Sequence, residues 1–120
     1  MEINIFNDPN DVPQPKDKIK IERVEATPYP DGFRVHVEID VTPFRERPNL
    51  LIVMLDEAGN NINELSVIET MHTKMEFTLH IRGKADPAGT YQIAVELFYE
   101  TRNPPQDQAS VSVDIPTADA

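Results

Sequence analysis

Two histidines and an acidic residue are the side chains of this sequence best suited to binding a transition metal. His36, Glu38 and His80 lie in segments where polar and apolar residues alternate. Two imidazoles and a carboxylate suit zinc, copper or nickel if the fold brings them onto one face. The alternative is a solvent-exposed polar face without metal, on which bases neutralise acids across strands, here Lys18 and Lys20 with Glu38 and Asp40.

Acidic residues in two other stretches suggest calcium as a second metal hypothesis. Calcium needs six to eight converging oxygen ligands, and neither stretch matches an Asp-x-Asp-x-Asp-Gly loop. Turn formation and solubility explain the same residues adequately, and we expect no cofactor. The residues concerned are Asp8, Asp11 and Asp17 near the N-terminus, and Asp56, Glu57, Asn60 and Asn61 further along.

Catalytic signatures are absent from the sequence. The three serines, Ser66, Ser110 and Ser112, have no local histidine partner, and there is no cysteine. A serine or cysteine nucleophile needs activation by a neighbouring base or charge. The sequence also lacks a Gly-x-Ser-x-Gly elbow, a phosphate-binding glycine loop and a His-Glu-x-x-His helix. We therefore predict a non-enzymatic protein.

Charge and hydropathy restrict the partners. The 120 residues include 21 acids and 11 bases, which gives a formal net charge of -10. This charge opposes binding to nucleic acid and to anionic lipid. The longest apolar run, residues 50–55, is far shorter than the ~20 residues that span a bilayer. Without signal-peptide features at the N-terminus, we expect no nucleic-acid partner, no membrane insertion and a cytoplasmic location.

The elements that must position these residues are β-strands, because the hydrophobic period from residue 18 onward is two. Residues 1–17 are predicted to be an extended Pro/Asp-rich segment, residues 18–116 one domain, and residues 117–120 a tail. A phase slip in the first strand suggests a bulge near Arg23. Turn signals separate seven predicted strands at residues 18–26, 33–42, 50–55, 62–69, 74–82, 91–100 and 111–115. Such short strands predict two packed antiparallel sheets.

The stretch Asp86-Pro87-Ala88-Gly89-Thr90-Tyr91 resembles the E–F corner of immunoglobulin-like and fibronectin-III-like domains. In those domains a tyrosine at the start of strand F bonds back to the backbone a few residues earlier. The resemblance covers about residues 18–115 as strands A, B, C, C′, E, F and G, without the antibody cysteines and tryptophan. It implies a seven-stranded antiparallel Ig-like β-sandwich of bacterial type with Greek-key topology, and a role in recognition or scaffolding. It also pairs strands B and E, which places His36 near His80.

One outer face of the predicted sandwich should be apolar. Residues 50–55 are apolar on both sides, so one of two sets, Leu50/Ile52/Met54 or Leu51/Val53/Leu55, must face outward beside Ala94 and Phe98. An exposed apolar patch marks an association surface. The alternative is that Ile3–Phe6 or the B–C loop with Phe44 covers it. We predict binding to another protein or to itself, as a homodimer, through Phe98, Ala94, Leu51, Val53 and Leu55.

The B–C loop offers a second contact for a protein partner. Arg45 and Arg47 flank Glu46 between two prolines, and arginine suits bidentate contacts to carboxylates. A small-ligand module that binds a metal ion, calcium or zinc, or a carbohydrate is the alternative function.

Overall fold

Seven β-strands form in the part of the chain that the structure describes, residues 12–117 of a computed structural model. Alternating side chains allow each strand to bury one face while the other remains polar. A 3₁₀ turn at Lys16–Lys18 precedes the strands. The strands are β1 (Ile21–Pro28), β2 (Arg34–Val41), β3 (Asn49–Leu55), β4 (Asn61–Val67), β5 (Lys74–His80), β6 (Gly89–Phe98) and β7 (Asp107–Ile115).

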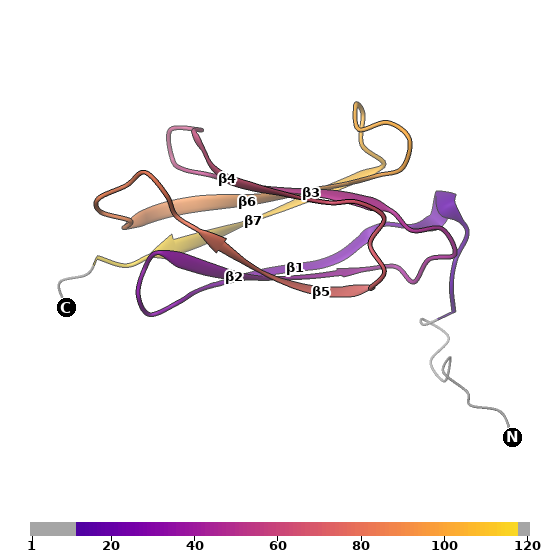
Figure 1. Cartoon of the computed structure of the whole chain (residues 1–120), viewed down its shortest axis with the longest axis horizontal. Helices are drawn as coiled ribbons and strands as arrows, with labels where there is room; N and C mark the ends of the chain where they lie inside the picture. The colour runs from indigo at the N-terminus through magenta and orange to yellow at the C-terminus, as the bar shows by residue number, and fades with distance from the viewer. Residues whose placement is uncertain (1–11, 118–120) are drawn as a thin grey trace, which may run out of the picture.

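The strands pack as two antiparallel sheets, β1-β2-β5 and β4-β3-β6-β7, that lie face to face (Figure 1). The chain crosses between the sheets after β2, after β4 and after β5. This order is that of an Ig-like β-sandwich, and the predicted all-β fold is confirmed. At the sides of the sandwich, β1 lies against β7 and β4 lies near β5.

The core lies between the sheets and settles the orientation of β3. Leu50, Ile52 and Met54 are completely buried in it, so Leu51, Val53 and Leu55 point to the outer face. The neighbouring strand β6 agrees with this orientation, because Ile52 pairs with Val95, which is also completely buried.

The start of β2 differs from the sequence prediction. Phe33 was expected to begin the apolar face of this strand, but its side chain is 41% exposed and β2 begins at Arg34. The turn explains the difference: Gly32 has a φ of 76°, and the Phe33 amide donates to Asp31 Oδ1 at 2.9 Å. In β1, the predicted bulge is confirmed by a register shift between Ile21 and Arg23.

The corner between β5 and β6 is closed by Tyr91. Its hydroxyl donates a 2.7 Å hydrogen bond to the carbonyl oxygen of Pro87, and its side chain is buried. Burial raises the pKa of the Tyr91 phenol. The backward hydrogen bond predicted from the resemblance is therefore confirmed.

Residues 12–17, which the sequence placed in the N-terminal segment, contact the sandwich. The amide of Gln14 donates to Pro43 O at 2.9 Å, and the amide of Arg45 donates to Gln14 O at 3.1 Å. Between these residues, Phe44 packs against the core cluster instead of covering the outer face. Ile3–Phe6 lie outside the described residues. Within residues 12–117, no helix is long and apolar enough to cross a membrane.

Candidate interaction surfaces

The five apolar residues predicted as a partner surface come together on the outer face of β4-β3-β6-β7. Val53 pairs directly with Ala94, while Leu51 pairs with Glu96 and Asn49 with Phe98. Because side chains of directly paired residues point to the same face, the five share this outer face, with Glu96 between Ala94 and Phe98 on β6. We call Leu51, Val53, Leu55, Ala94 and Phe98 the apolar stripe.

Polar residues border the apolar stripe. Glu64 on β4 pairs with Val53, and on β6 Glu96 lies beside Leu51. Leu51 is only 8% exposed although it lies outside the core cluster, so neighbours on the outer face must shield it. Arg102 Nε lies 3.0 Å from Glu96 Oε1.

A shallow hollow adjoins the stripe on this face, between β6 and β7. It has a volume of about 410 Å³. Ala94 pairs with Ser110 across the two strands, and the small side chains here leave the space open. We call it the Ala94 hollow; its lining includes Ala94, Glu96, Gln108, Ala109 and Ser110.

The outer face of β1-β2-β5 is covered by paired charges instead. The Arg23 guanidinium contacts three carboxylates, at 2.7 Å to Glu38, 2.8 Å to Glu25 and 3.0 Å to Asp40. The Arg23 contact, followed by that of His36, lowers the pKa of Glu38. The predicted polar face therefore exists, but Arg23 replaces Lys18 and Lys20 as its main cation, because Lys18 lies in the 3₁₀ turn before β1.

The proposed metal ligands are only partly brought together. His36 Nε2 lies 3.2 Å from Glu38 Oε2 and 3.4 Å from Glu76 Oε1. His36 pairs with Thr78, however, and His80 pairs with Arg34. Among residues 12–117, no group of three His, Cys, Asp or Glu residues is placed to hold a metal ion. The set of His36, Glu38 and His80 is thus not assembled.

In the acidic turn proposed for calcium, the carboxylate oxygens bind groups of the chain itself. Asp56 Oδ1 accepts from the amides of Ala58 at 3.0 Å and Asn60 at 2.8 Å, and Lys84 Nζ lies 3.2 Å from Asp56 Oδ2. The Asn60 hydrogen bonds, together with Lys84, lower the pKa of Asp56 to about 2. Glu57 accepts from the Thr90 amide. Asp8 and Asp11 lie outside the described residues.

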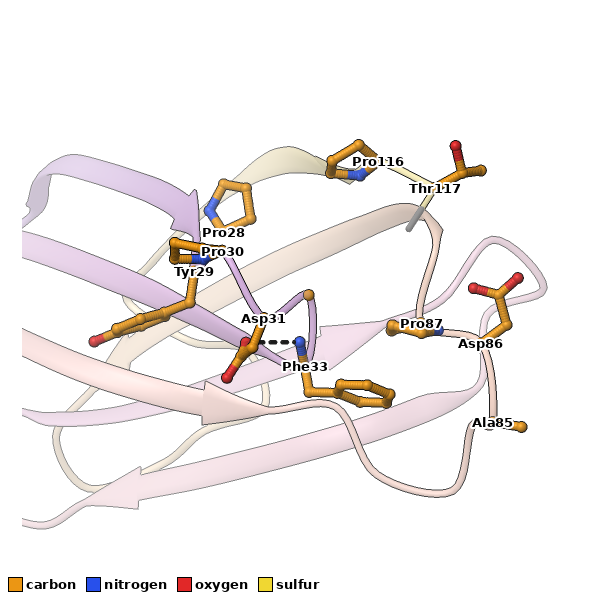
Figure 2. Close-up of a pocket in the computed structure, with 11 residues that line it drawn as sticks. Pro28, Tyr29, Pro30, Asp31, Phe33, Ala85, Asp86, Pro87, Pro116 and Thr117 are labelled. Carbon is orange, nitrogen blue, oxygen red and sulfur yellow. Dashed lines mark hydrogen bonds between the residues drawn. The ribbon is translucent and has the colours of Figure 1, made fainter. Parts of the chain in front are cut away.

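A further hollow lies where the β1–β2 turn, the β5–β6 loop and the end of β7 meet, and it was not predicted from the sequence. It measures about 880 Å³ and is open to solvent. Figure 2 shows the Phe33 ring directed toward Pro87, with Asp86 beyond it and Asp31 joined to the Phe33 amide. The sequence feature that could have indicated this hollow is the set of prolines that interrupt the strand pattern. Four of them line it: Pro28, Pro30, Pro87 and Pro116.

The connection between β4 and β5 exposes two large apolar side chains, Ile68 at 71% and Met71 at 68%. The sequence predicted a strand over residues 62–69, which would include Ile68, but β4 ends at Val67. The backbone of this connection is held by the start of β3 and the loop before it, because the Glu69 amide donates to Asn49 Oδ1 at 2.8 Å and the Thr70 amide to Pro48 O at 3.0 Å. We call residues 68–72 the loop tip.

The predicted arginines lie in the β2–β3 loop that holds the loop tip. Arg45 and Arg47 are exposed, and with residues 12–117 they form no ion pair. Exposed guanidinium groups suit the contact to a partner carboxylate that the sequence predicts.

Comparison with known proteins defines the class of fold. No family model matches the chain, and no curated protein matches it. A β-glucuronidase from Bifidobacterium dentium, complexed with coumarin-3-O-glucuronide, aligns with a TM-score of 0.57 at 14% identity over 81% of this chain and 18% of that one. A glycosyl hydrolase family 2 member from Bacteroides cellulosilyticus aligns with a TM-score of 0.56 at 17% identity over 81% and 14%. The chain thus shares a β-sandwich fold with a small part of these larger enzymes.

Proposed function

We propose that this chain is an Ig-like or fibronectin-III-like domain of bacterial type that acts as a non-enzymatic interaction module and associates with itself through the outer face of β4-β3-β6-β7. The apolar stripe is the observation that carries the proposal. Apolar side chains gathered on one outer face among polar groups are typical of association surfaces.

The difference between the two outer faces supports this assignment. On β1-β2-β5, Arg23 alone contacts three carboxylates, and burying such a network would remove charges from water at a large cost. On β4-β3-β6-β7, the apolar side chains of Val53 and Ala94 lie side by side. Their removal from water carries no such desolvation cost. The net charge of -10 further favours a protein partner over nucleic acid or an anionic membrane.

The experiment is sedimentation velocity of the purified chain at low and high concentration. We expect concentration-dependent association of the wild type, and a Kd raised roughly tenfold or more by Phe98→Asp, because the new carboxylate would have to leave water at the contact. Thr27→Asp adds the same charge to the outer face of β1-β2-β5 and should leave association unchanged. A wild type that remains monomeric at high concentration would overturn the proposal.

A small-ligand module is a second candidate function, favoured by the hollow beside Phe33. An aromatic ring exposed on the wall of an open hollow of about 880 Å³ offers a sugar a surface to stack on. Titration calorimetry with a glucuronide, with calcium chloride and with zinc chloride tests this function. Binding of the glucuronide that is lost in Phe33→Ala would support it, and no heat from any of the three would exclude it.

A further inference from the structure

We infer that Met71, His72 and Met75 form a binding site for a soft monovalent metal ion, of which Cu(I) is the biological example. Residues 71–75 read Met-His-Thr-Lys-Met and run from the loop tip into the start of β5. The site lies apart from the apolar stripe and does not depend on the proposed self-association.

The three side chains line one hollow. It has a volume of about 410 Å³ and lies between the loop tip and the first residues of β5. Met71 and His72 line it from exposed positions, whereas Met75 lines it from a position that is only 7% exposed. The volume leaves room for an ion and for the exposed side chains to turn toward it.

Thr70 holds two of the proposed ligands close together around one oxygen atom. The buried Thr70 Oγ1 accepts from the His72 amide at 3.2 Å. Its own proton has two acceptors, His72 O at 3.2 Å and Met75 Sδ at 3.3 Å. The Met75 sulfur is therefore fixed beside the backbone of His72. When a metal ion binds this sulfur, the hydroxyl still has His72 O as an acceptor, so the hydrogen bond to sulfur is not needed.

Met71 supplies the adjustable ligand. Its side chain is 68% exposed, and methionine is unbranched with three rotatable bonds, so its sulfur can turn into the hollow that it lines. The backbone beside it is held, because the Thr70 amide donates to Pro48 O at 3.0 Å. Binding of an ion would thus order side chains without ordering the loop, which limits the entropy cost.

The donor atoms select the metal ion. Thioether sulfur is a soft, neutral ligand that favours Cu(I), and imidazole nitrogen also binds copper. Calcium needs oxygen ligands, and zinc takes cysteine, histidine or carboxylate ligands. Among residues 12–117, no group of three His, Cys, Asp or Glu residues is placed to hold a metal ion. Two sulfurs and one imidazole therefore point to Cu(I) rather than to calcium or zinc.

The charges around the hollow favour a cation. Its lining carries two carboxylates, Glu69 and Glu76, and one ammonium group, Lys74. Lys74 Nζ lies 3.5 Å from Asp40 Oδ2, so a carboxylate outside the lining already opposes this ammonium. Glu76 Oε1 lies 3.4 Å from His36 Nε2. The balance of negative charge attracts an ion of charge +1.

The test is titration of the full chain with silver nitrate, followed by NMR of the methionine methyl groups and histidine rings. Ag(I) carries the same charge as Cu(I), shares its preference for sulfur and is stable in air. We expect Ag(I) to shift the methyl signals of Met71 and Met75 and the ring signals of His72. The methyl signal of the completely buried Met54 should not move. Zinc chloride is the control ion and should shift no methionine methyl.

Matched variants measure the affinity for Cu(I), in anaerobic competition with a chromophoric chelator. Met71→Leu and Met75→Leu keep apolar side chains of similar size but remove the sulfur, and each should raise the Kd roughly tenfold or more. His72→Gln should also raise it. His80→Gln removes an exposed histidine that does not line the hollow and should leave the Kd unchanged. If Met75→Leu does not fold, Met71→Leu and His72→Gln decide the test.

Three results would overturn the inference. The first is that Ag(I) leaves the methyl signal of Met71 or of Met75 in place. The second is a shift confined to Met1, which would indicate binding at the chain terminus only. The third is a Kd for Cu(I) that Met71→Leu does not change. None of these results bears on the sedimentation experiment, so this inference and the proposed function fail separately.

Discussion

Tyr91 shows how a single hydroxyl stabilises the corner from which β6 begins. The hydroxyl reaches Pro87 O at 2.7 Å in a buried setting. Tyr91→Phe removes the donor and leaves that carbonyl without its partner, so we expect a loss of about 1–2 kcal/mol in the free energy of unfolding, measured by urea denaturation. Tyr29→Phe is the matched control, because its hydroxyl meets Thr78 at the surface. Equal losses in the two variants would contradict this account.

Asp56 links local turn structure to the pH dependence of stability. Its pKa is lowered from 3.8 to about 2, so its ionised form stabilises the folded state above about pH 4, and this contribution is lost as the pH falls toward 2. Urea midpoints should therefore show wild type more stable than Asp56→Asn near neutral pH, with the difference shrinking near pH 2.

Asp86→Asn is the control for Asp56→Asn. Asp86 makes a similar turn bond, to the Ala88 amide, but forms no ion pair with any residue from 12 to 117. Asp86→Asn therefore controls for the loss of a turn hydrogen bond without the loss of an ion pair. A constant difference between wild type and Asp56→Asn across the pH range would contradict the assignment.

At the scale of the element, β3 is the strand on which both the core and the proposed surface depend. It is the second strand of a four-stranded sheet and hydrogen-bonds to β4 and β6. Its two apolar faces have different roles: one fills the core through Leu50, and the other forms the stripe through Leu51, Val53 and Leu55.

This orientation of β3 can be tested with two identical substitutions. Leu50→Ala deletes a completely buried side chain and should cost about 2–5 kcal/mol in unfolding free energy. Leu55→Ala, on the half-exposed outer face, should cost about 1 kcal/mol or less. Chemical denaturation compares them, and a larger cost for Leu55→Ala would mean that the strand is turned the other way.

At the scale of the whole molecule, the two sheets meet at their edges as well as through the core. Near β5, the Asn63 side-chain amide of β4 donates to His80 O at 3.0 Å. Asn63→Ala should cost about 1 kcal/mol by removing this link between the sheets. Asn61→Ala is the control, since Asn61 bonds Glu64 within its own strand; its cost in thermal or urea unfolding should be near zero, and a cost equal to that of Asn63→Ala would contradict the link.

The amphipathic strands and the Tyr91 corner were predictable because their determinants are local. In β2, Val35, Val37 and Ile39 alternate with polar residues, so a period of two specifies both the strand and its buried face. The hydroxyl of Tyr91 bonds a residue only four positions earlier, and the surrounding Pro and Gly indicate the turn.

The tertiary structure alone decided the features that depend on which segments become neighbours. Leu50 to Leu55 are all apolar, so the sequence does not show which alternate side chains of this strand face the core. Only packing against β6 shows which side is buried. The pairing of β2 with β5 placed His80 opposite Arg34 rather than opposite His36, a register that neither strand specifies by itself. Ile68 and Met71 are exposed in a connection whose backbone bonds Asn49 and Pro48, residues distant in the chain. Local pattern thus determines strands and turns, whereas surfaces arise from contacts between residues distant in the chain.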